Sequence, residues 1–180
     1  MSDMTPFETI IQRIDSYKDD MIKLQIDLTA IPALSPDNGG DGEFNRAQFI
    51  SKCLTDMNFP NLAQIDAPDS RTSSGVRPNL VATIPGNNPQ NTVWIMTHMD
   101  VVPPGELELW DEDPFKCYVK DGRVYGRGTE DNQQDLVSSI FAAKAFLDEG
   151  IKPQSSIGLA FVADEETASR FGLSFILRRN

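Results

Sequence analysis

Histidine is almost absent from this chain of 180 residues, which contains one, and cysteine is scarce, with two. Cys53 and Cys117 lie in dissimilar contexts without CxxC spacing, which favours buried free thiols over a disulfide or a cysteine metal site. Basic residues are also few: 16 Lys and Arg accompany 27 Asp and Glu, for a net charge of −11. Such a surface repels nucleic acid and anionic membranes and attracts divalent cations.

Long hydrophobic runs are missing as well. The apolar stretches are far too short to span a bilayer, and the N-terminal segment lacks the basic and apolar regions of a signal peptide. We therefore expect a cytoplasmic protein. What is present is 39% hydrophobic residues, enough for one globular domain with a core. The sequence has no repeat, low-complexity tract or linker.

Helix-like and strand-like segments alternate along the chain. Apolar residues at spacings of three and four from Phe7 to Leu28 predict one amphipathic helix. Apolar runs bounded by Gly, Pro and Asn predict strands at "NLVATIPG", "TVWIMTH" and "SSIGLAFVAD". Further helices are expected over "EFNRAQFISKCLTDMNF", over "DLVSSIFAAKAFLDEG" and from "FGLSFILRR", with a hairpin over "KCYVKDGRVYGRG" that turns at Asp121-Gly122. This alternation predicts an α/β sandwich around a largely buried sheet.

Acidic residues and the single histidine follow the predicted strands. His98 ends "TVWIMTH" and Asp100 follows it, Asp131 lies between the hairpin and a helix, and Glu165 and Glu166 follow "IGLAFVAD". Ligands bind beyond the carboxyl ends of strands in open α/β sheets. His98 and Asp100 would also point to the same face of an extended strand.

Each of these residues has a purely structural interpretation when it is taken alone. A single histidine is usually structural, Asp131 could cap a helix or favour its first turn, and two adjacent glutamates could be solvated charges. Taken together, a strand-end imidazole and carboxylates at successive strand ends indicate a site for Zn²⁺ or a similar divalent ion. One of His98 and Asp100 can therefore ligate the metal while the other orients that ligand from behind.

Four fragments occur in order along the chain: "THMDVVP", Trp110 with "DPF" at 113–115, "GRVYGRGTEDNQQ" and "ADEET". Together they resemble the M20 family of metallopeptidases, which includes carboxypeptidase-like, aminoacylase-like, acetylornithine deacetylase-like and succinyl-diaminopimelate desuccinylase-like enzymes. The resemblance implies a three-layer α/β sandwich of the zinc-exopeptidase type, with a mostly parallel, mixed central sheet. It also implies that residues 1–180 are the truncated N-terminal portion of a catalytic domain, without its C-terminal part and the lid or dimerisation domain.

The resemblance further implies a role for each candidate residue. His98 would ligate one of two zinc ions, Asp131 would bridge them and Glu166 would ligate the other, with Co²⁺ as a possible substitute. Asp100 would hold the ring of His98, and Glu165 would be the general base that deprotonates the attacking water. The peptide bond after Asp131 would be cis. The segment "EDNQQ" departs from the "DxK" pattern of many members.

We accordingly expect a metal-dependent hydrolase of amide bonds in small peptides or N-acyl amino acids, homodimeric in its full-length form. The family completes its metal ligands with a distal histidine and a further acid, and this chain has one histidine. Little activity is therefore expected from the chain alone. Two alternatives remain, a non-catalytic metal-binding remnant and an acidic interaction module, which metal stoichiometry and turnover would separate.

Overall fold

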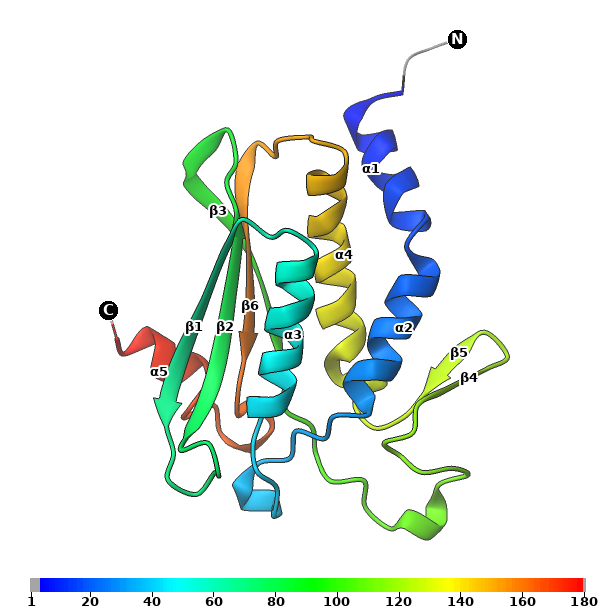
Figure 1. The fold of residues 1–180 in the computed structure, drawn as a ribbon, viewed down its shortest axis with the longest axis vertical. Helices are drawn as coiled ribbons and strands as arrows, with labels where there is room; N and C mark the ends of the chain where they lie inside the picture. Colours follow the sequence, from blue (N-terminus) through cyan, green and yellow to red (C-terminus); the bar gives the residue numbers. More distant parts are fainter. Residues whose placement is uncertain (1–3, 180) are drawn as a thin grey trace.

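The computed structural model describes residues 4–179 and contains a four-stranded sheet (Figure 1). Its strands are β1 (Asn61–Pro68), β2 (Val76–Ile84), β3 (Asn88–His98) and β6 (Ser155–Val162), in the order β1-β2-β6-β3. β1 and β6 both pair antiparallel with β2, whereas β3 and β6 are parallel. The sheet is mixed, as expected, but one of its three pairings is parallel, not the majority.

Four helices cover one face of this sheet: α1 (Pro6–Asp15), α2 (Lys18–Thr29), α3 (Phe44–Asp56) and α4 (Gln134–Asp148). α3 and α4 lie against the strands, and α1 and α2 pack on α4 (Figure 1). The short α5 (Leu173–Leu177) lies on the opposite side. Within the described residues, the second helical layer of the expected three-layer sandwich consists of α5 alone. None of the helices between residues 4 and 179 is long and apolar enough to cross a membrane.

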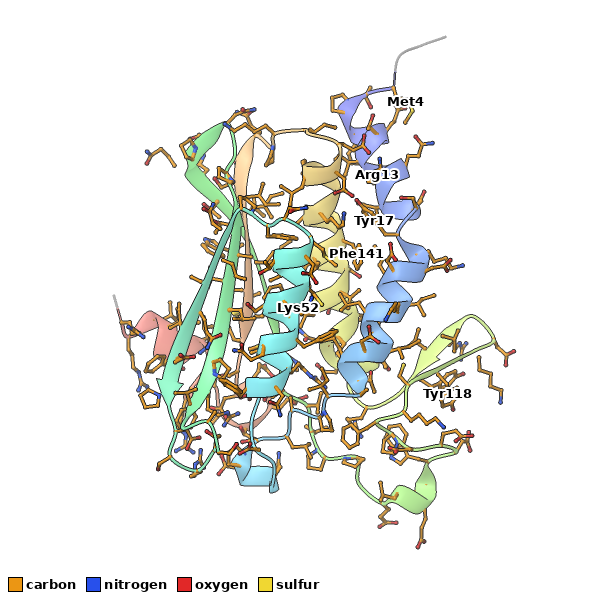
Figure 2. The ribbon with its side chains drawn as sticks, viewed as in Figure 1. Met4, Arg13, Tyr17, Lys52, Tyr118 and Phe141 are labelled. Atoms are coloured by element: carbon orange, nitrogen blue, oxygen red, sulfur yellow. The ribbon has the colours of Figure 1, made fainter. Side chains whose placement is uncertain are left out.

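The hydrophobic core lies between the sheet and the four helices. Tyr17 and Phe141 meet between the N-terminal helices and α4, with ring centroids 5.1 Å apart (Figure 2). Every layer contributes buried apolar side chains, among them Ile10, Leu24, Leu28, Ile50, Leu54, Leu80, Ile140, Leu159 and Phe161. Their removal from water is the main force that holds the sheet against the helices.

The N-terminal helix differs from its prediction. The chain forms two helices instead of one, and Tyr17, the N-cap residue of α2, accepts the amide of Met21. α1 begins with a capping box, in which the side chains of Thr5 and Glu8 each accept a hydrogen bond from the other residue's backbone amide. Phe7, expected on the buried face, is 73% exposed. Cys53 and Cys117 are free thiols, as expected, but both are only partly buried.

The segment between β3 and α4 runs below the sheet in Figure 1 before it reaches the start of α4. It contains the predicted hairpin, β4 (Tyr118–Lys120) and β5 (Arg123–Tyr125), and then one π-helical turn, η3 (Thr129–Gln133). Asp131 and Asn132 have non-helical backbone angles inside that turn, and the bond between them is cis, as the resemblance implied. Three single turns of 3₁₀ helix complete the fold: η1 (Pro36–Asn38), η2 (Leu107–Leu109) and η4 (Glu165–Thr167).

Candidate metal centre

His98 is the last residue of β3, and its ring is held at both nitrogens. Nδ1 lies 3.0 Å from the backbone carbonyl of Asp100 and 3.5 Å from its carboxylate, and Nε2 lies 3.0 Å from Oδ1 of Asp131. The backbone amide of His98 donates to the side chain of Asn132. The end of β3 and the turn that contains Asp131 are therefore tied together at two points.

Three of the predicted residues converge at this point. One ligating atom each from His98, Asp131 and Glu166 lies within 4.8 Å of the other two. The parallel pairing of β3 with β6 brings His98 and the segment after β6 to the same edge, because parallel strands end on the same side. Glu165 also lies close, with Oε2 4.0 Å from Nε2 of His98. The structure thus gathers these four residues, and their individual roles stay predictions.

Asp100 makes contacts that the sequence did not indicate. Its carboxylate is fully buried and accepts the backbone amides of Glu165 at 3.1 Å and of Glu166 at 2.9 Å. One aspartate therefore contacts the ring of His98 and also fixes the backbone that carries both glutamates.

The charges in the cluster shift its pKa values. Burial lowers the pKa of His98, but the hydrogen bond and charge of Asp100, together with Asp131, outweigh it and raise the pKa to about 9. Burial, followed by the negative charge of Asp131, raises the pKa of Glu166. Both shifts are typical of a cluster in which acidic groups face each other and share one cationic ring.

A hollow of about 220 Å³ opens beside Asp131 and Glu166, lined also by Val102, Gly128 and Arg127. Arg127 packs over the ring of Trp110, 5.3 Å from its centroid. A larger hollow of about 660 Å³ lies along residues 111–120 and is lined by none of the cluster residues.

Gln133, at the position of the lysine in the "DxK" pattern, is buried. Its amide donates to the carbonyl of Arg127 at 3.1 Å and accepts the hydroxyl of Thr29 at 3.2 Å. Gln133 is thus accommodated inside the fold. Its hydrogen bond to Thr29 connects the turn that contains Asp131 with α2.

Four further polar residues around the cluster are buried and were not singled out from the sequence: Glu43, Arg46, Arg77 and Asn79. Charged residues are mostly exposed, so a charged residue in a loop or strand gives little sign of burial. The run "RPN" overlaps only the first residue of the predicted strand "NLVATIPG" but lies within β2, where a charge followed by two poor strand formers is unusual.

Comparison with known proteins agrees with the motifs. The family model for peptidase family M20/M25/M40 matches residues 94–178, which include His98, Asp100, Asp131, Glu165 and Glu166. This stretch of the chain is similar to peptidase family M20/M25/M40. The resemblance predicted from the four fragments is confirmed.

Among the curated M20 relatives, an uncharacterised metallohydrolase of Methanococcus maripaludis is 40% identical over 168 residues, which cover 90% of this chain and 40% of the relative. A succinyl-diaminopimelate desuccinylase of Parvibaculum lavamentivorans is 31% identical over 163 residues, covering 89% and 38%. The chain thus spans about 40% of the length of these relatives.

The fold is also that of a solved M20-type structure. The dipeptidase Dug1p of Saccharomyces cerevisiae superimposes with a TM-score of 0.80 at 27% identity, covering 95% of this chain and 37% of that chain. The predicted α/β fold of the zinc-exopeptidase type is therefore confirmed.

Proposed function

We propose that this chain supplies the first ligands and the general base of a two-metal site that hydrolyses amide bonds. The convergence of His98, Asp131 and Glu166 within 4.8 Å carries the proposal. The roles implied by the resemblance are compatible with this convergence: Asp131, 3.0 Å from Nε2 of His98, would be shared between two ions, and Glu166 would ligate the second.

The donor set fits a divalent cation such as Zn²⁺. One imidazole nitrogen and several carboxylate oxygens are ligands that zinc accepts. The carbonyl of Asp100 engages Nδ1, which leaves Nε2 directed at Asp131 and available as a ligand. A cation between Nε2 and Asp131 would also relieve the repulsion among the clustered carboxylates.

Glu165 and Glu166 differ in a way that suits two roles. The side chain of Glu165 is 50% exposed and faces His98 from 4.0 Å, whereas Glu166 belongs to the ligand cluster. A bound divalent ion polarises the amide carbonyl and acidifies water. Glu165, near the cluster but free of metal, would then accept the proton of the attacking water and pass it to the leaving nitrogen.

The substrate class is proposed from the relatives. One is a succinyl-diaminopimelate desuccinylase and another a dipeptidase, so a small peptide or an N-acyl amino acid is the substrate that both support. The division of the longer protein into a catalytic domain and a lid or dimerisation domain, its homodimer and its cytoplasmic location stay predictions.

The test separates metal ligation from proton transfer. We expect His98→Ala and Glu166→Ala to weaken Zn²⁺ or Co²⁺ binding by ~10-fold or more, since each removes a ligand, whereas Glu165→Gln should retain the metal. Glu130→Ala, which removes a neighbouring acid at the same hollow, is the control for charge alone. Isothermal titration and elemental analysis measure the binding.

Hydrolysis of N-acyl amino acids and dipeptides, with and without added metal, completes the test. Glu165→Gln should abolish any turnover present, because an amide cannot take a proton from water. Equal metal loss in all four variants would reject the assignment, and no metal binding by the unmutated chain would favour the acidic interaction module.

A further inference from the structure

The segment that follows β6 has an unusual backbone. Asp164, Ala168 and Ser169 have φ angles of 62°, 150° and 57°, which non-glycine residues rarely adopt. Such conformations persist where the surroundings enforce them. Glu165 and Glu166 lie between these residues, so whatever holds this loop also sets the direction of both glutamates.

The buried carboxylate of Asp164 holds the loop from within. It accepts the backbone amides of Arg170 at 2.7 Å and of Phe171 at 3.2 Å, and the hydroxyl of Thr167 donates to it. Gly172 then returns against Ala163, where an added Cβ would lie 1.9 Å from the carbonyl oxygen. The loop is therefore wrapped around the side chain of Asp164.

A buried ion pair, Glu43 and Arg77, also contacts Asp164. Nε and Nη2 of Arg77 each donate to one carboxylate oxygen of Glu43, and both side chains are completely buried. Glu43 also accepts the backbone amide of Asp164 at 3.1 Å, and Arg77 lies 3.6 Å from the Asp164 carboxylate. The pair thus binds both the backbone and the side chain of the residue that precedes Glu165.

Stability alone does not explain this arrangement. A buried ion pair contributes little to folding compared with apolar residues of similar volume, because desolvation offsets its attraction. Burial lowers the pKa of Arg77, but the hydrogen bonds and charge of Glu43, followed by the charges of Asp164 and Asp100, raise it overall. Arg77 therefore stays charged, and its fixed fork can define a direction that an apolar contact would leave free.

We propose that Glu43 and Arg77 are positioning residues that orient Glu165 and Glu166 through Asp164. The two glutamates are then held on opposite sides: Asp100 accepts their amides, and the Glu43–Arg77 pair fixes the turn that precedes them. That this orientation serves metal binding and proton transfer rests on the proposed function. The orientation itself can be measured without metal.

The experiment compares Glu43→Gln with a pair of variants at Asp164. Glu43→Gln keeps the shape of the side chain but loses the charge opposite Arg77. Asp164→Asn keeps an acceptor and tolerates the left-handed conformation, whereas Asp164→Ala loses both. Ile50→Val, a conservative change in the hydrophobic core on α3, is the control for a general loss of stability.

Two readouts are taken on the complete 180-residue chain. Hydrogen exchange of the Glu165 and Glu166 amides in metal-free protein reports the loop, and Co²⁺ titration with its visible spectrum reports the ligands. We expect Glu43→Gln and Asp164→Ala to speed exchange at these two amides while β2 stays protected, and to weaken Co²⁺ binding by ~10–100-fold. Asp164→Asn should show exchange rates and Co²⁺ affinity closer to those of the unmutated chain. Ile50→Val should change neither the exchange of these two amides nor the Co²⁺ affinity.

Folded Glu43→Gln and Asp164→Ala proteins with normal exchange at both amides would overturn the inference. If Glu43→Gln does not fold, the Asp164 pair decides: equal exchange rates in the Asn and Ala variants would overturn it. Failure of the unmutated chain to bind Co²⁺ would instead count against the proposed metal site, and the exchange data would still decide whether the loop is held in this way.

Discussion

The imidazole of His98 carries a proton at the place where a metal would bind. Nδ1 meets a carbonyl oxygen and Nε2 meets a carboxylate oxygen, both at 3.0 Å. A neutral ring can donate from only one nitrogen, so both contacts together require the imidazolium. The pKa of about 9 agrees with this geometry, and the proton therefore competes with a cation for Nε2.

This competition predicts how metal binding depends on pH. Below about pH 9 the metal must displace a proton, so the apparent affinity should rise close to tenfold per pH unit from pH 7 to 9. In the metal-free chain, folding stability changes with pH in the opposite direction. The raised pKa of His98 contributes stability that is fully present below the pKa of His98 in the unfolded chain. This contribution is lost as the pH rises through about 9. Titration calorimetry in two buffers of different ionisation enthalpy should show the released proton, and a pH-independent affinity would contradict the assignment.

Ala168 offers a second prediction at the level of one residue. Its φ of 150° suits glycine, and its side chain is exposed. Ala168→Gly should therefore stabilise the chain by about 1 kcal/mol, after the entropic cost of glycine is subtracted from the relieved strain. The melting temperature should rise by ~2–4 °C. Ala160→Gly, the same change in the middle of β6, should lower the melting temperature. Equal decreases in the melting temperature of both variants would show that the backbone at Ala168 is not strained.

Among the elements, α3 does more than cover the sheet. The buried guanidinium of Arg46 donates to the carbonyls of Leu28 at 3.0 Å, Ile31 at 2.7 Å and Met99 at 2.8 Å. Burial lowers its pKa to about 10, which still leaves it charged at neutral pH. α3 thereby joins the end of α2 to the residue after His98.

Arg46→Met should destabilise the chain by roughly 3 kcal/mol or more, because buried carbonyls lose a charged donor and gain no other. Urea denaturation measures the change through its midpoint at constant slope. Lys52→Met, on the exposed side of the same helix with 72% of its side chain accessible, should have little effect. Similar losses in the two variants would indicate that the methionine, and not the lost hydrogen bonds, causes the change.

The elements also show which features a sequence can predict. Helices α3 and α4 follow from local apolar periodicity, and strands β2, β3 and β6 follow from apolar runs bounded by Gly, Pro and Asn. β1 was missed since it is an edge strand whose residues are mostly exposed, with Ala67 buried among them. The break between α1 and α2 was missed because Tyr17 continues the apolar spacing of the helices on either side.

The same reasoning applies to the candidate site. His98, Asp131 and Glu166 were predictable because each follows an element with a clear pattern, within a fragment of the family. Glu43 and Arg77 were not, because their pairing joins positions 34 residues apart. In the sequence, Glu43 is one more acid, at the start of a predicted helix that follows a glycine-rich loop, and only the folded chain brings the two charges together out of water.

For the whole molecule, a continuous run of exposed apolar residues lies on the outer edge of the sheet. β3 is an edge strand, and Val93, Trp94, Ile95 and Met96 are between 36% and 58% exposed. Successive residues of a strand point to opposite faces, so apolar side chains are exposed on both sides of β3 beside an unpaired row of backbone groups. Edges of this kind pair readily with another chain, because they offer both hydrogen bonds and apolar contacts.

We therefore expect the 180-residue chain to self-associate through β3 as its concentration rises, by strand pairing with a second copy. Val93→Lys should shift the sedimentation profile toward monomer, since a charge at an edge opposes pairing of identical strands. Val119→Lys is the matched control, because Val119 is 48% exposed on the β4–β5 hairpin. Monomer at all concentrations in the unmutated chain, or an equal effect of both lysines, would show that β3 is not the surface of association. A shift confined to Val93→Lys would instead identify β3 as the edge at which this sheet accepts a further strand.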